Sequence, residues 1–64
     1  MYMTVKDVKT NQEFVVPIGD DRAFVTTKDG VKVKLHPVVI STMVRRGQKF
    51  DGQTVKGPRE MVRV

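Results

Sequence analysis

The fold is indicated most clearly by the stretch Lys28–His36, which is Lys-Asp-Gly-Val-Lys-Val-Lys-Leu-His. From Val31 onward, apolar and polar residues alternate strictly, a pattern typical of a β-strand with one buried side. The alternation assigns Val31, Val33 and Leu35 to the core and Lys32, Lys34 and His36 to the outer face. Asp29-Gly30 precedes the strand and is a hairpin signal, because glycine accepts the positive φ that such a turn needs. The stretch therefore predicts the turn and the second strand of a β-hairpin.

Alternation also marks the segments that come before this hairpin strand. Arg22–Thr27 is expected to pair with it, and if Ala23 and Val25 face the core, then Arg22, Phe24 and Thr26 face outward. Glu13–Ile18 and Tyr2–Val8 predict two further strands. Pro17 cannot donate to a sheet ladder, so its strand is expected at an edge or to end there.

The second half of the chain predicts shorter elements. Val38–Arg46 is compatible with one helical turn, with Arg45-Arg46 near its end and Gly47 closing it. Gln48–Val55 predicts a strand broken at Asp51-Gly52, Gly57-Pro58 a turn, and Glu60–Val64 a last strand with Val62 and Val64 inward. Five or six short strands without a long helix indicate an all-β fold. We expect one domain over residues 1–64, a small antiparallel barrel of the OB or SH3-like type.

The composition restricts the class of protein. The 64 residues include no cysteine and one histidine, so neither disulfides nor a metal site is expected to staple the fold. The longest apolar run is Val38–Ile40, too short to span a membrane, and no apolar signal segment precedes the first charges. A cytoplasmic location is therefore expected. With one serine, one histidine and no glycine-rich phosphate loop, the chain shows no catalytic constellation, so neither enzymatic activity nor a cofactor is expected.

The charge is strongly uneven. Twelve Lys and Arg against seven Asp and Glu leave a net charge of +5. Residues 1–30 carry four basic and five acidic side chains, whereas residues 31–64 carry eight basic and two acidic ones. The bases alternate with valines in predicted strands, so they share a surface of the barrel. Such a surface favours nucleic acid as the partner, over an anionic membrane or an acidic protein.

Four motifs occur in the order in which one known family has them. Ala23–Gly30 is similar to a Gly-Phe-Gly-Phe-Ile-Thr-Pro motif followed by Asp-Gly, and Val33–Ile40 to Val-Phe-Val-His-Phe-Ser-Ala-Ile. Arg46–Phe50 is similar to a Gly-Gln-Lys-Val stretch, and Lys56–Val64 to a Lys-Gly-Pro stretch with an Asn-Val ending. Over residues 22–64 the chain thus resembles the bacterial cold-shock domain, a five-stranded OB-type barrel. The resemblance implies binding of single-stranded RNA or DNA.

The chain departs from that family mainly in its aromatics. Phe24 and His36 match the family's motifs, but Arg22, Lys34 and Pro37 stand where the family has phenylalanines. The family's first strand corresponds either to residues 2–9 or to residues 13–18, and in the second case residues 2–9 are an added strand. The sequence leaves both alignments open.

We therefore expect binding of single-stranded RNA or DNA, mainly through phosphates, with steep salt dependence and little sequence preference. Phe24 is either a stacking platform or part of the core, whereas Phe14 and Phe50 are expected in the core. His36 is either a base or phosphate contact or an ordinary surface histidine. The predicted nucleic-acid-binding residues are Arg22, Phe24, Lys32, Lys34, His36, Arg45, Arg46, Lys49, Lys56 and Arg59. The expected role is that of a transcription or translation accessory factor.

The alternative is a small adaptor or inhibitor that docks on a larger protein, such as a component of the transcription machinery. Met43, Val44 and Met61 would suit a docking surface if exposed, since methionine adapts to irregular partners, and would otherwise fill the core. The strand that contains Pro17 could offer an edge for strand addition. The sequence does not decide the oligomeric state.

Overall fold

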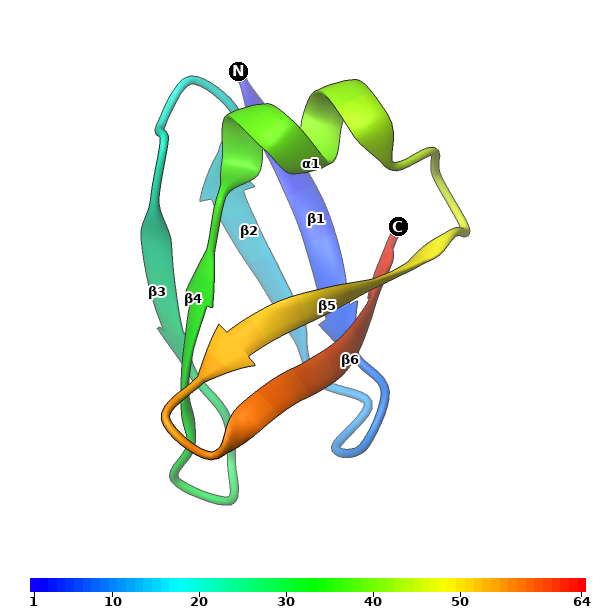
Figure 1. Cartoon of the computed structure of the whole chain (residues 1–64). Helices are drawn as coiled ribbons and strands as arrows, with labels where there is room; N and C mark the ends of the chain where they lie inside the picture. The colour runs from blue at the N-terminus through cyan, green and yellow to red at the C-terminus, as the bar shows by residue number, and fades with distance from the viewer.

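Six antiparallel strands form one sheet that curls into a nearly closed barrel in the computed structural model, which describes all 64 residues (Figure 1). The strands are β1 (Tyr2–Asp7), β2 (Glu13–Pro17), β3 (Ala23–Thr26), β4 (Lys32–Leu35), β5 (Lys49–Thr54) and β6 (Gly57–Arg63), and α1 spans Pro37–Met43. The strand order is β2-β1-β6-β5-β4-β3. The predicted all-β, OB-like barrel is confirmed.

The two edge strands, β2 and β3, meet at the seam of the barrel without forming a ladder. The backbone N–H of Lys28, just after β3, donates to the side-chain oxygen of Gln12, just before β2, at 3.0 Å. Pro17 lies in β2, so its missing N–H interrupts no interior ladder, as expected for an edge strand.

The β3–β4 hairpin forms as predicted. Phe24 pairs with Lys34 and Thr26 with Lys32, so these four side chains share the outer face. The turn contains Gly30 at φ 82°, and the Thr27 N–H donates to the Val31 carbonyl at 2.9 Å. The hairpin therefore fixes which side chains of β3 and β4 face the solvent.

The barrel interior holds the core, which consists of Met3, Val5, Val16, Val33, Leu35, Ile40 and Met61. Phe14 and Phe50 are half-buried and pack against this cluster, in agreement with their predicted core placement. Ile40 and Pro37 anchor α1 over one end of the barrel (Figure 1). No helix is long and apolar enough to cross a membrane.

Strands β5 and β6 differ from the sequence prediction. β5 runs unbroken through Asp51-Gly52, because the inner face at Gly52 lies against Val33 and leaves no room for a side chain. The hairpin turn lies at Val55–Lys56, and Gly57-Pro58, predicted as a turn, begins β6.

The prediction that Val62 and Val64 of the last strand face the core is also wrong. Met61 is fully buried, whereas Val64 is exposed and Val62 is only half-buried. Val62 pairs with the exposed Lys49 and so points to the outer face. A one-residue shift in strand assignment moves every side chain to the other face, which explains this error.

The ambiguous segment after Pro37 is helical over seven residues, more than the single turn considered. It ends at Val44, which has extended backbone, and not at Gly47. Arg63 closes this end, because its Nη1 donates to the carbonyls of Ser41 at 3.1 Å and Val44 at 2.8 Å. These bonds satisfy carbonyls that have no partner within the helix.

Candidate nucleic-acid interface

The outer face of the β3–β4 hairpin brings several predicted residues together. Phe24 is 52% exposed and lies directly opposite Lys34, and Lys34 in turn pairs with Gln53 of β5. Arg22 directly precedes β3 and His36 directly follows β4, so the ladder continued by one pair places them opposite each other. We call this surface the Phe24 patch; it consists of Arg22, Phe24, Lys32, Lys34, His36 and Gln53.

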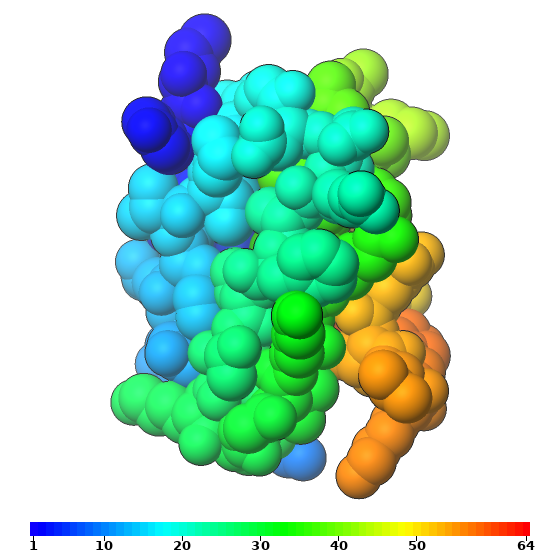
Figure 2. Space-filling view, turned by 90° about the vertical axis from the view of Figure 1, so that its left-hand side faces the viewer, coloured from blue at the N-terminus to red at the C-terminus, as the bar shows by residue number.

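A hollow lies beside the Phe24 ring. It has a volume of about 310 Å³ and is lined by Phe24, Lys32, Lys34, Gln53, Thr54 and Val55. In Figure 2 it is found where the green β4 side of the molecule faces the orange tip of the β5–β6 hairpin, which stands out from the surface. Phe24 and Val55 are its two hydrophobic lining residues, and two of the other four are lysines.

Lys32 lies close to the face of the aromatic ring, with its Nζ 4.5 Å from the Phe24 centroid. Such a cation–π contact contributes about 0.5–1 kcal/mol at an exposed site. A base stacked on an aromatic side chain contributes about 1–3 kcal/mol. The energy of a stacked base would therefore be at least as large as that of the Lys32 contact that it would replace.

His36 is held by the turn before β3. Its Nδ1 lies 2.6 Å from the Asp21 carbonyl, which can only accept, so Nδ1 carries a proton. In neutral His36 the other ring nitrogen, Nε2, is therefore the acceptor. This bond fixes the half-buried ring beside Arg22.

Lys56 is adjacent to the Phe24 patch. It lines a second hollow of about 290 Å³ together with Lys32, Thr54 and Val55, the last two of which also line the first hollow. Its side chain therefore adds a basic residue next to the Phe24 patch, at the tip of the β5–β6 hairpin, and Asp29 also lines this second hollow.

Three predicted residues lie elsewhere. Arg45 and Arg46 are in the loop after α1, and Lys49 begins β5. Along the outer face of β5, Asp51 separates Lys49 from Gln53, and Asp51 lies opposite Glu60 of β6. Lys49 forms an ion pair with Glu60, with its Nζ 3.8 Å from the Glu60 Oε1. Asp51 and Glu60 therefore separate Arg45, Arg46 and Lys49 from the basic residues of the Phe24 patch.

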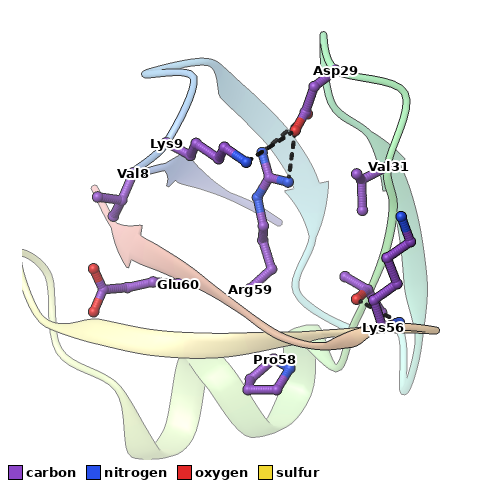
Figure 3. A pocket seen from close by; sticks show the side chains of 9 residues that line it. Val8, Lys9, Asp29, Val31, Lys56, Pro58, Arg59 and Glu60 are labelled. Atoms are coloured by element: carbon purple, nitrogen blue, oxygen red, sulfur yellow. Dashed lines mark hydrogen bonds and ion pairs between the residues drawn. The ribbon is translucent and has the colours of Figure 1, made fainter.

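Arg59 is not an exposed base. Its side chain is 11% exposed and lies at the end of the barrel opposite α1, where the carboxylates of Asp7 and Asp29 bind it. Figure 3 shows its contact with Asp29. Its Nε and Nη2 donate to Asp7 at 2.9 and 2.7 Å, and its Nη1 donates to Asp29 at 3.0 Å. Arg59 therefore links β1, β6 and the β3–β4 turn, and its charge is neutralised within the fold.

The ion cluster shifts the protonation equilibria of its members. Hydrogen bonds from Arg59 lower the pKa of Asp7 and of Asp29, against the opposing effect of desolvation. Thr10 adds hydrogen bonds to Asp7, and Thr27 adds one to Asp29. The same bonds raise the pKa of Arg59, first through Asp7 and then through Asp29.

The cluster borders the largest hollow of the molecule, of about 590 Å³ (Figure 3). Lys9 and Lys56 line it, but so do Asp29 and Glu60, and Lys9 lies 3.9 Å from Asp29. Opposite charges offset one another there, so this end is less suited to a polyanion than the Phe24 patch. No three His, Cys, Asp or Glu side chains gather anywhere in a way that could hold a metal ion.

Sequence reasoning missed Gln53 and Val55 as neighbours of Phe24. If β5 is taken as one continuous strand, the alternation of side chains predicts that Gln53 points to the outer face. Its pairing with Lys34 of β4 is a contact between strands and does not follow from the sequence around Gln53. Of the residues considered for protein docking, Met61 is buried, Val44 is half-buried and Met43 is 74% exposed.

No protein-family model, curated protein sequence or solved structure matches the chain. The resemblance of residues 22–64 to the cold-shock domain stays a prediction from the quoted motifs.

Proposed function

We propose that this protein binds single-stranded RNA or DNA through the Phe24 patch. The observation that carries the proposal is the half-exposed Phe24 ring beside a hollow that Lys32 and Lys34 also line. Stacking platforms and phosphate-binding cations are the two ingredients of single-strand recognition, and here they occur on one face of one hairpin. The resemblance to the cold-shock domain implies the same class of ligand, and with it a role as a transcription or translation accessory factor.

The patch favours a single strand over a duplex. Phe24 projects from a sheet and offers its ring face, which a base can cover only when it is not stacked on both of its own neighbours. The projecting β5–β6 hairpin bounds the hollow between Phe24 and Val55 (Figure 2). A hollow bounded in this way accepts one flat ring more readily than a rigid double helix. Bases in a duplex are buried between their neighbours, so a duplex would lose the stacking contribution.

Phosphate contacts supply most of the affinity. The cations around the ring are the exposed Arg22, Lys32 and Lys56 and the half-buried Lys34, none of which forms an ion pair with an acidic side chain. Each phosphate contact on a single strand contributes about −0.7 to the slope of log K against log salt, so four contacts give a slope of about −3. Gln53 can donate to and accept from a base edge, but it is the only such side chain in the patch, so sequence preference is expected to be slight.

The test is fluorescence anisotropy with labelled single-stranded oligonucleotides and a duplex of equal length. Phe24→Ala is expected to weaken single-strand binding about tenfold, as the loss of one stacked base implies. The matched control is Tyr2→Ala, which removes an exposed aromatic from β1 and is expected to leave affinity unchanged. Equal losses in the two variants would contradict the assignment of Phe24.

A second pair of variants locates the phosphate contacts. Lys32→Gln/Lys34→Gln and Arg45→Gln/Arg46→Gln each remove two positive charges, so both reduce the net charge equally. We expect the first pair to reduce the salt slope by about 1.4, and the second pair to change it much less. A larger effect of the arginine pair would move the interface to the loop after α1, and no binding at low salt would remove the proposal.

A further inference from the structure

The outer face of α1 is unusual for a surface helix because it exposes apolar side chains and carries no charge. The helix is Pro-Val-Val-Ile-Ser-Thr-Met and contains no charged residue, although it lies on the surface. Pro37 and Ile40 point into the barrel, which leaves Val38, Val39 and Met43 exposed. These three residues and Thr42 line a shallow hollow of about 200 Å³. Surface helices normally place charged residues on the side away from the core, so a face of this kind indicates a partner.

The two ends of this helix carry opposite charges. At its beginning, the Val38 N–H donates to the Asp20 carbonyl at 3.1 Å, which places Asp20-Asp21 beside the first turn. At its end, Arg45 and Arg46 follow Val44 directly. All four charged residues are exposed, and none of them forms an ion pair within the chain. The apolar face is thus flanked by unpaired acids at one end and unpaired bases at the other.

This arrangement is complementary to itself. When two copies of the helix pack antiparallel about a two-fold axis, the beginning of one helix lies beside the end of the other. Asp20-Asp21 of each copy then faces Arg45-Arg46 of its partner, and Val38, Val39 and Met43 of both copies meet between them. A two-fold interface uses the same patch on both subunits, which is what this distribution of charge requires.

We propose that the protein self-associates through α1, as an antiparallel helix pair closed at both ends by these charges. The helix is only about 10 Å long. The contact is therefore well below the roughly 800 Å² per partner of a standard interface, out of 4386 Å² exposed by the chain. The dimer is accordingly weak, reversible and dependent on concentration and salt. The hollow beside Phe24 shares no lining residue with the hollow on α1, so the dimer leaves the Phe24 hollow open.

The apolar part of the interface is tested by sedimentation equilibrium of the full chain without nucleic acid, over a concentration series that extends to about 1 mM. The wild-type average mass is expected to rise toward that of a dimer, and Val39→Lys/Met43→Lys to remain monomeric. The control is Val55→Lys, which alters a fully exposed valine in the β5–β6 turn, at the end of the barrel away from α1 (Figure 1). A wild-type chain that stays monomeric throughout would overturn the proposal and leave the face to a different partner.

The charge pairing is tested by reversal. Asp20→Lys/Asp21→Lys and Arg45→Glu/Arg46→Glu each place like charges at both ends of the interface and are expected to weaken self-association by roughly tenfold or more. An equimolar mixture of the two variants restores opposite charges at both ends, so the mixture is expected to dimerise. Self-association of either variant at the wild-type level, or a mixture that stays monomeric, would show that these charges do not pair.

Discussion

Gly52 is the position at which adding one carbon atom is expected to affect the fold most. It lies in the middle of β5, with its α-carbon facing the barrel interior. A Cβ at this position would overlap Cγ1 of Val33 and would approach Sδ of Met61 to 3.2 Å and Cδ2 of Leu35 to 3.3 Å. All three neighbours are almost fully buried. Gly52→Ala therefore inserts a methyl group into a space that is already filled.

The magnitude follows from how little these neighbours can move. Valine has a strongly restricted χ1, so Val33 cannot rotate away without a strained rotamer or a shift of β4. Overpacking of this kind costs about 1–3 kcal/mol in the free energy of unfolding. For a domain of this size each kcal/mol lowers Tm by about 4–8 °C, so even the low end is measurable by thermal unfolding.

The assay is urea unfolding followed by circular dichroism, with Gly19→Ala as the matched control. Nothing lies within 4 Å of a Cβ at Gly19, so this variant is expected to be neutral or slightly more stable. Val33→Ala alone is expected to cost about 2 kcal/mol, because it removes two buried methyl groups. In the double variant each change relieves the other, so the combined loss should be smaller than the sum by about 1 kcal/mol or more. A Gly52→Ala variant as stable as Gly19→Ala would refute the packing argument.

Three further predictions concern stability. Because Arg59 lowers the pKa of Asp7 and Asp29 in the folded state, the contribution of these two carboxylates to the free energy of unfolding is expected to be complete above about pH 5. It should fall as the pH drops below about 4, and urea unfolding of Arg59→Met should show a weaker dependence on acid. Gly30→Ala forces a side chain into positive φ and is expected to cost about 1 kcal/mol in the same assay. Arg63→Met removes the bonds that close α1, and amide hydrogen exchange should become faster at the end of the helix while β1 exchanges as before.

The β3–β4 hairpin shows what local pattern can establish. Strict alternation fixed the faces of Lys32 and Lys34, and Asp29-Gly30 located the turn, because both signals act between near neighbours in the chain. The outward direction of Phe24 followed from the same parity. Five of the six residues of the Phe24 patch were therefore predictable from residues 22–36, and Gln53 is the exception.

The last two strands show where local pattern failed. Gly52 suggested a break, but its missing side chain is required by Val33 of another strand, which no local window contains. Gly57-Pro58 suggested a turn, but the turn is formed by Val55 and Lys56 instead. The resulting one-residue shift assigned Val64 to the core in place of Met61.

The basic residues show a similar limit. Arg59 was counted with the exposed bases because its partners are distant in sequence; Asp7 lies 52 positions away. Asp51 and Glu60, the only acids in the second half of the chain, lie opposite each other on the outer face of β5 and β6. The +6 charge of residues 31–64 is therefore not one surface, and the function that we propose depends on the part of it that surrounds Phe24.

The most direct test of that function is a titration of a labelled single-stranded oligonucleotide with wild-type protein and Phe24→Ala, at low and at physiological salt. We predict that the wild type binds at low salt, loses affinity with a log–log slope of about −3, and binds about tenfold more tightly than Phe24→Ala at each salt concentration. The absence of binding at low salt, or equal affinity of the two proteins, would contradict the account.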